Sequence, residues 1–140
     1  MIKIFTRNFV FITMVWVLPL ALSQIIRAQN AAERRFYGKW ITGAGRENCL
    51  VIEDNMIAVS LSIQDLDGML FVKMESQDAD AFNQVADETV VDGDKIKITF
   101  GQLDALYKGK INEADNQIKG TIAFLGRIYP LSFMKIMQVK

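Results

Sequence analysis

The amino-acid sequence predicts an all-β protein, built as an antiparallel up-and-down meander of about eight strands. From Phe36 onward, apolar residues recur at every second position and not at the helical spacing of 3.6 residues. Short turn-forming pairs separate these alternating runs. Connections this short pair each strand with the next one along the chain. A twisted meander of this size tends to close, because closure removes its exposed edges. We therefore expect a barrel or a barrel-like sandwich.

The N-terminal segment predicts an export signal. Lys3 and Arg7 form a short positive region, and an apolar run of 14 residues follows at 9–22. Small residues beyond this run offer cleavage after Ser23 or after Ala28. This three-part layout is typical of a cleaved signal peptide.

The alternative is an uncleaved membrane anchor over residues 9–26, a length near the lower limit for spanning a bilayer. We expect cleavage, and with it a periplasmic or extracellular protein that meets the membrane only during export. The domain organisation is then a signal peptide at 1–28, a linker at 29–35 and the β domain at 36–140.

The alternating runs place the individual strands. The predicted strands cover residues 36–43, 48–52, 56–64, 68–75, 85–91, 94–100, 104–112, 117–124 and 127–137. The 48–52 run can merge with a neighbour, which leaves eight strands. The turn signals between runs are Asp67-Gly68, Asp92-Gly93, Asp115-Asn116 and Leu125-Gly126. The last strand is apolar on both sides, with Ile128, Met134 and Ile136 on the face opposite Tyr129, Leu131 and Phe133.

Composition excludes several kinds of chemistry. Histidine is absent, which removes Ser-His-Asp and Cys-His catalysis and histidine-ligated zinc. Cys49 is the only cysteine, so the chain has no internal disulfide, and we expect this thiol to be a small buried apolar residue. Asp78 and Asp80 form a D-x-D pair in a polar stretch, which we interpret as a solvated loop because calcium needs more oxygen ligands. No metal site, cofactor or catalytic set is predicted.

The charge distribution argues against nucleic acid as a partner. A chain that begins at Gln29 keeps 13 basic and 16 acidic residues, a net charge of −3. Binding to phosphate backbones needs a concentrated basic face. The densest basic pair along the sequence is Arg34–Arg35, so no such face is expected.

Several motifs then show a family resemblance. Gly38-Lys39-Trp40 on the first strand resembles the Gly-x-Trp opening of lipocalin-like barrels. The segments DGMLFVKMES, VVDGDKIKITF, LYKGKIN, IKGTIAF and YPLSFMK follow in order. Together they resemble the lipocalin-like module that precedes the catalytic domain of certain secreted bacterial α/β-hydrolases, and the short exported lipocalin-like proteins of Bacteroidetes. The chain differs from the hydrolase-linked module at Glu75–Ala79 and at Ala123–Leu125. The resemblance implies a lipocalin-like barrel and a non-catalytic role.

Two functions follow as hypotheses. The first is a binding module that encloses a small apolar ligand, since eight-stranded barrels hold one small ligand or fill with side chains. The predicted ligand-lining residues are Trp40, Val59, Leu61, Met74, Phe100, Tyr107, Phe124 and Leu131. Gly109 and Gly120 lie in phase with these residues and mark either a gap or a close approach. The second hypothesis is a protein-interaction or accessory module with a filled barrel, serving a secreted hydrolase or an envelope protein. An enzyme is not expected.

Overall fold

The computed structural model describes residues 29–43, 49–114 and 116–137. The predicted export signal lies outside this part of the chain. The chain divides into two compact units, residues 1–31 and 32–140. Residues 29–34, predicted as a linker, are helical. Among the described residues, no helix has the length and apolar character needed to cross a membrane.

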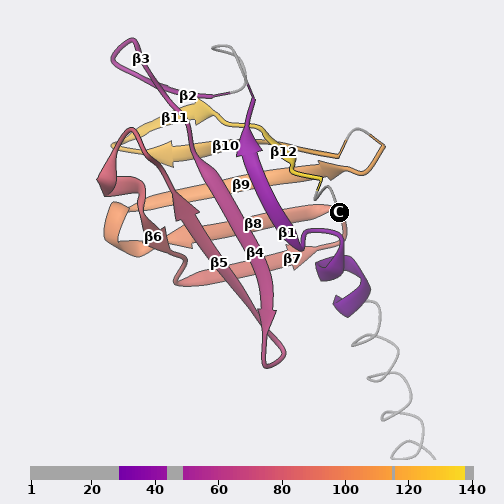
Figure 1. Ribbon diagram of the computed structural model, residues 1–140. Coiled ribbons are helices and arrows are strands. Elements are labelled where there is room, and N and C mark those ends of the chain that lie inside the picture. The colour runs from indigo at the N-terminus through magenta and orange to yellow at the C-terminus, as the bar shows by residue number, and fades with distance from the viewer. Residues whose placement is uncertain (1–28, 44–48, 115, 138–140) are drawn as a thin grey trace, which may run out of the picture. The chain divides into compact units, whose positions relative to one another are not determined.

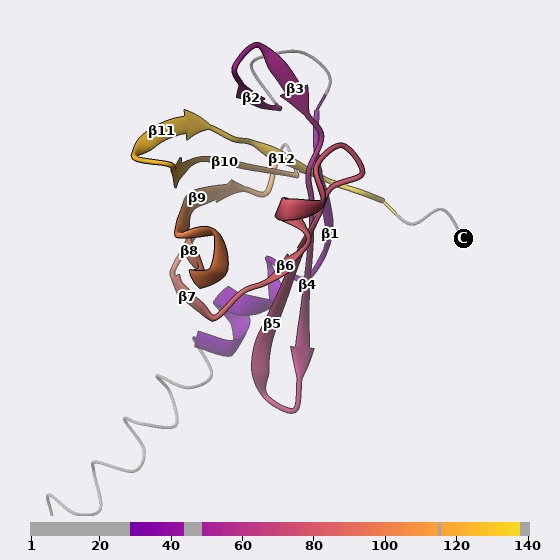
Figure 2. The ribbon, with the colours of Figure 1, turned by 90° about the vertical axis from the view of Figure 1, so that its left-hand side faces the viewer.

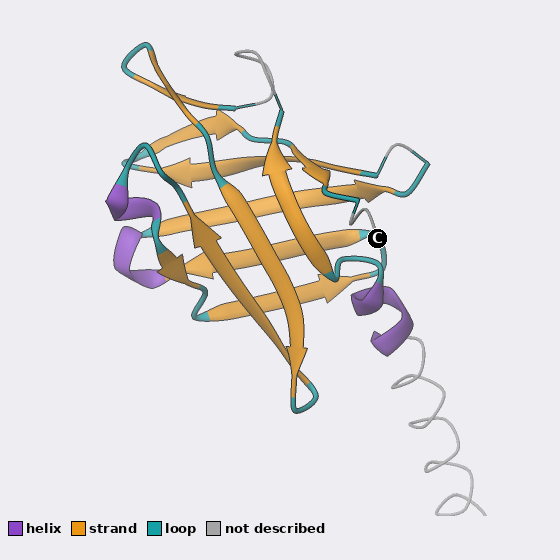
Figure 3. Ribbon diagram, viewed as in Figure 1, coloured by secondary structure: helices purple, strands orange, loops and turns teal. Residues whose placement is uncertain are grey.

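The second unit is built almost wholly from strands, with two short 3-10 turns between them (Figure 3). The elements are β1 (Gly38–Thr42), β2 (Leu50–Ile52), β3 (Asn55–Ile57), β4 (Ser60–Leu66), β5 (Met69–Glu75), η1 (Asp80–Phe82), β6 (Gln84–Val85), β7 (Glu88–Asp92), β8 (Lys95–Phe100), η2 (Gly101–Leu103), β9 (Ala105–Asn112), β10 (Gln117–Phe124), β11 (Arg127–Pro130) and β12 (Phe133–Lys135). The prediction of an all-β antiparallel fold is confirmed.

One sheet contains ten of these strands, in the order β6-β5-β4-β1-β12-β10-β9-β8-β7, and β11 pairs with β10 beside that path. Strands β11 and β12 both lie along β10, so they act as one broken strand. Sequential strands pair from β4 to β6 and from β7 to β11. Strand β1 pairs with β4, beyond the β2–β3 hairpin, and with the end of the chain through β12. This is the predicted up-and-down connection. Strands β2 and β3 form a separate hairpin.

The sheet curls until its two ends meet in the segment between β6 and β7. The amide of Ala86 donates to the carbonyl of Val72 on β5, and the next amide, of Asp87, donates to Thr99 on β8, both at 2.9 Å. One continuous stretch of chain therefore changes partners and joins the ends. In Figures 1 and 2, β1, β4 and β5 form one layer that crosses the β7–β10 layer at a steep angle.

Three of the predicted strands are interrupted. The predicted strand 85–91 divides at residues 86–87, between β6 and β7. The alternation over 56–64 continues through Ala58, but the structure ends β3 at Ile57 and begins β4 at Ser60. The backbone of Ala58 bonds to side chains in place of a neighbouring strand. Its amide donates to Asp78 Oδ2 (2.9 Å) and its carbonyl accepts from Ser76 Oγ (2.8 Å). The predicted strand 127–137 is broken at residues 131–132.

Two of the predicted turns, Asp67-Gly68 and Leu125-Gly126, are present as predicted. The turn predicted at Asp92-Gly93 lies one residue later, at Gly93-Asp94, because Asp92 still belongs to β7. Asp67 and Gly68 both have positive φ, 54° and 83°, in the two-residue connection between β4 and β5. Leu125 and Gly126 have φ of 54° and 73° between β10 and β11. Positive φ at both central residues matches the twist of the flanking strands, which is why such turns favour hairpins.

The space between the two layers is filled by a continuous hydrophobic core. Trp40 is 1% exposed, as predicted from its Gly-x-Trp position, and its indole N–H donates to the carbonyl of Phe36 at 2.8 Å. Phe36 and Leu50 are fully buried. Cys49 is buried, as expected for an apolar residue in this place.

Candidate functional site

The predicted ligand-lining residues face the inside of the sheet. Seven of the eight are buried in the core, namely Trp40, Val59, Leu61, Met74, Phe100, Tyr107 and Leu131. Phe124 is half-buried and packs against Phe82, with ring centroids 5.3 Å apart. The structure thus brings the set together as parts of a packed core. That they line a ligand stays a prediction.

The two inward glycines, Gly109 and Gly120, are neighbours across β9 and β10, and Tyr107 covers both. A Cβ built on Gly109 would lie 2.9 Å from Tyr107 Oη, and one built on Gly120 would lie 2.7 Å from the same atom. The phenol donates to the carbonyl of Leu131 at 3.0 Å. Burial raises the pKa of Tyr107 well above its ordinary value of 10.0. The glycines therefore make room for a tyrosine ring.

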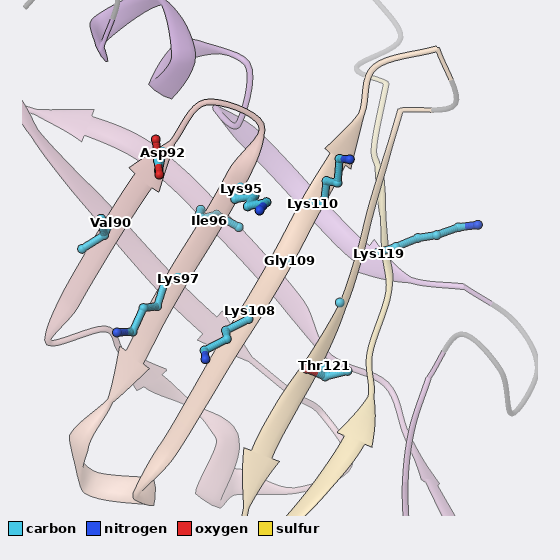
Figure 4. A pocket seen from close by; sticks show the side chains of 11 residues that line it. Val90, Asp92, Lys95, Ile96, Lys97, Lys108, Gly109, Lys110, Lys119 and Thr121 are labelled. Carbon is cyan, nitrogen blue, oxygen red and sulfur yellow. The ribbon is translucent and has the colours of Figure 1, made fainter.

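The outer face of the same strands carries a hollow of about 480 Å³. Its polar lining consists of five lysines together with Asp92 and Thr121 (Figure 4). The lysines are Lys95 and Lys97 on β8, Lys108 and Lys110 on β9, and Lys119 on β10. All five are exposed, while the residues that alternate with them on β8 and β9 are buried. We call these five residues the lysine face.

The strand register places the lysines directly opposite one another. Lys95 pairs with Lys110, and Lys110 pairs in turn with Lys119 on its other side. Lys97 pairs with Lys108. Figure 4 shows these side chains rising from neighbouring strands on the same face. Like charges directly opposite each other destabilise a sheet. Three such pairs on three adjacent strands are therefore a cost in stability that an anionic partner would relieve.

Carboxylates lie directly beside the lysines at one end of the lysine face. Asp92 is the cross-strand partner of Lys95, and Asp94 Oδ2 lies 3.6 Å from Lys110 Nζ. The pair Lys97–Lys108 is flanked instead by Val90 on β7 and by a threonine on β10. Among the described residues, Lys97 and Lys108 thus have no carboxylate as a direct cross-strand partner.

This arrangement corrects the expectation that the chain has no concentrated basic face. The lysines are spread over 25 positions of sequence, and only the pairing of β8, β9 and β10 gathers them. The outward position of each lysine could nevertheless be predicted from the sequence. Lys95-Ile96-Lys97 and Lys108-Gly109-Lys110 repeat lysine at the outward positions of consecutive predicted strands, and Lys119 does so on the next.

Two further hollows continue the lysine face in both directions along the strands. One of about 590 Å³ shares Lys110 and Lys119 and extends to Arg35. The other, of about 540 Å³, shares Lys97 and extends to Arg127. Arg35 is held in place there, since it donates to Glu113 Oε1 and to the carbonyl of Gly93, both at 2.7 Å. Basic residues thus follow β8–β10 from one hollow to the next, with Asp94 and Glu113 also lining the first of these two hollows and Asp104 the second.

The remaining sequence candidates do not form a site. Asp78 accepts the amide of Ala58, so its carboxylate fixes the loop before η1. Over residues 29–43, 49–114 and 116–137, no group of acidic or cysteine side chains could hold a metal ion.

The second apolar face of the last strand is open to solvent. Ile128, Met134 and Ile136 are 73%, 49% and 38% exposed. Ile41, the cross-strand partner of Met134 on β1, is 40% exposed. The two-sided apolar character of this strand therefore leaves one face in contact with solvent, and it is not a strand covered on both sides.

We compared the sequence and the structure with those of known proteins. No protein-family model matches the sequence, and no curated protein matches it significantly. Two crystal structures of single-residue mutants of the fluorescent protein UnaG resemble the structure, with TM-scores of 0.46 and 0.45. They share 13% and 15% sequence identity with it, and each match covers 75% of this chain and 99% of the other. A likeness at this level says nothing about a ligand.

Proposed function

We propose that this chain is an exported, non-catalytic binding module that holds an anionic partner on the lysine face. The observation that carries the proposal is the set of three like-charged pairs, Lys95–Lys110, Lys110–Lys119 and Lys97–Lys108. Binding of an anion there replaces repulsion by attraction and releases counterions. The lining supplies positive charge from three neighbouring strands, which suits the binding of an anion.

A chromatographic experiment tests this proposal. The exported form that begins after Ala28 has a net charge of −3 and should pass through a sulfonate-bearing cation exchanger on net charge alone. The lysine face predicts retention at low salt. The double variant Lys97→Gln/Lys108→Gln should then elute at clearly lower salt than the parent. The matched variant Lys39→Gln/Lys73→Gln loses the same charge from β1 and β5 and should elute close to the parent. Equal shifts for both variants would refute a localised site.

Export is tested separately. The small residues at Ser23 and Ala28 after the apolar run support a cleaved signal. Intact-mass analysis of protein from the periplasmic or extracellular fraction should show a chain that starts after one of these residues. Full-length chain in the membrane fraction would favour the anchor.

The small apolar ligand inside the barrel remains a separate hypothesis, tested by uptake of an apolar fluorescent probe and its displacement by fatty acids. The packing of Tyr107 over Gly109 and Gly120 argues against it, so we expect no uptake by the native protein. The accessory role beside a hydrolase or envelope protein rests on the exposed Ile41–Met134 pair and on the family resemblance.

A further inference from the structure

The lysine face is elongated along β8–β10, and this shape favours an elongated partner. The central hollow shares Lys110 and Lys119 with one neighbour and Lys97 with the other, so the three hollows form a row along β8–β10. Strand β9 has eight residues, which span about 27 Å at 3.4 Å per residue. A compact anion would fit into one of these hollows, whereas an extended anion could contact all three.

The charges repeat along this row. Lys95 and Lys97 on β8, like Lys108 and Lys110 on β9, are two residues apart. In a strand this places them about 6.8 Å apart, and neighbouring strands lie about 4.8 Å apart. The result is a small lattice of cations that suits a chain with anionic groups at regular intervals.

The residues and strands around the lysine face favour one of three classes of extended anion over the other two. Single-stranded nucleic acid is held by aromatic side chains on which bases stack, and the central hollow has no aromatic residue in its lining. The hollow beside it is lined by Phe100, which is fully buried, and by Phe124, which is half-buried against Phe82. Acidic peptides commonly add a strand to a free sheet edge, but β8, β9 and β10 each have partners on both sides. A polymer that is recognised by its charges alone meets neither obstacle.

We infer that the lysine face binds a linear acidic polysaccharide, which lies along β8–β10 with its carboxylate or sulfate groups between the lysines. This inference rests on the proposed function and narrows the partner to one class. Lys97 and Lys108 form the centre of the site, where no carboxylate lies opposite. Arg35 and Arg127 lie at its two ends.

The test is titration of the exported protein with oligogalacturonates of increasing length, which carry one carboxylate per sugar. Methyl-esterified fragments of the same lengths are the neutral match. Affinity should rise with length until a fragment spans the row, by about tenfold or more over the single sugar, and the esters should not bind. The slope of log K against log salt should fall by about 0.7 for each lysine removed, as for flexible single-stranded polyanions. Lys97→Gln/Lys108→Gln should show this fall, and Lys39→Gln/Lys73→Gln should keep the parental slope.

Other outcomes overturn the inference in distinguishable ways. Binding of the single sugar as tightly as the long fragments would mean a compact-anion site. Tighter lysine-dependent binding of oligo(dT), or of vesicles rich in phosphatidylglycerol, would replace the polysaccharide by nucleic acid or by a membrane surface. In these three cases the proposed anion site stands. If no anion binds in a manner that depends on Lys97 and Lys108, both the inference and the proposed function fail. Sulfated oligosaccharides in a parallel series distinguish sulfate from carboxylate as the preferred group.

Discussion

Lys108 lies between Lys97 on β8 and Thr121 on β10, and its side chain is exposed. Lys108→Glu therefore converts one repulsive cross-strand pair into an attractive one and leaves the core untouched. Opposite charges across strands contribute about 0.2–1 kcal/mol, and like charges cost a similar amount. Solvent screening of exposed pairs keeps such terms at the low end. We expect the free energy of unfolding to rise by about 0.5–1 kcal/mol at low salt.

Thermal unfolding measures this gain. For a domain of this size, about 1 kcal/mol corresponds to about 4–8 °C in Tm, so Lys108→Glu should melt about 2–8 °C higher than the parent. Near 1 M salt the Debye length is about 3 Å and the gain should vanish. The same variant should lose binding to the anionic matrix, so that stability and binding change in opposite directions. The control Lys39→Glu lies opposite Ser62 and should show no gain. A lower Tm for Lys108→Glu, or a gain that persists in high salt, would refute the electrostatic reasoning.

Three predictions concern the core. Gly120→Ala should destabilise the protein by more than the usual overpacking cost of about 1–3 kcal/mol, because its Cβ would lie 2.2 Å from the carbonyl oxygen of Lys108. Gly109→Ala should cost less, since the atoms its Cβ meets belong to side chains; denaturant midpoints that rank the two in the opposite order would contradict this. Tyr107→Phe removes the donor to Leu131, at a cost of about 1–3 kcal/mol in denaturant unfolding at neutral pH. Because burial raises the pKa of Tyr107, the hydroxyl loses its proton at a lower pH in the unfolded chain than in the folded protein. Above pH 10.0 the ratio of folded to unfolded protein should therefore fall by about tenfold for each pH unit. The phenylalanine variant should lack that contribution, and parallel pH profiles would show the cause to lie elsewhere. Trp40→Ala should cost about 3–5 kcal/mol, and an unchanged midpoint would mean that its buried position is wrong.

The fold was predictable because local signals agreed with each other. Ile96 and Ile98 alternate with lysines, and Asp67-Gly68 supplies a two-residue turn, so periodicity and turn chemistry indicated the same strands. The interruptions were not predictable in this way. The alternation runs unbroken through Ala58, and only contacts with Ser76 and Asp78, distant in sequence, take its backbone out of the ladder.

The candidate site was less predictable than the core, for a physical reason. A buried position is marked by its own residue type, so Trp40 and Tyr107 could be assigned from the strand phase alone. A charge cluster on a sheet depends on the register between strands, and η2 with Asp104 (φ 50°) fixes that register between β8 and β9. A shift of one residue would have sent Lys108 to the other face. The lysine face therefore became visible only with the pairing.

The joint between β6 and β7 is also one of the places where few hydrogen bonds hold the sheet together. Strand β6 has two residues, and beyond it the ends of the sheet are joined through the amides of Ala86 and Asp87. Parting β5 from β7 breaks these few bonds, while the longer ladders between β8, β9 and β10 remain intact. Regions with few such bonds open with a free energy below that of global unfolding, and amide hydrogen exchange reports this directly. We therefore expect the amides of Ala86 and Asp87 to exchange faster than those in the ladders between β8, β9 and β10. Opening of the sheet at this joint, on the side away from β10 and β12, would expose the core to solvent.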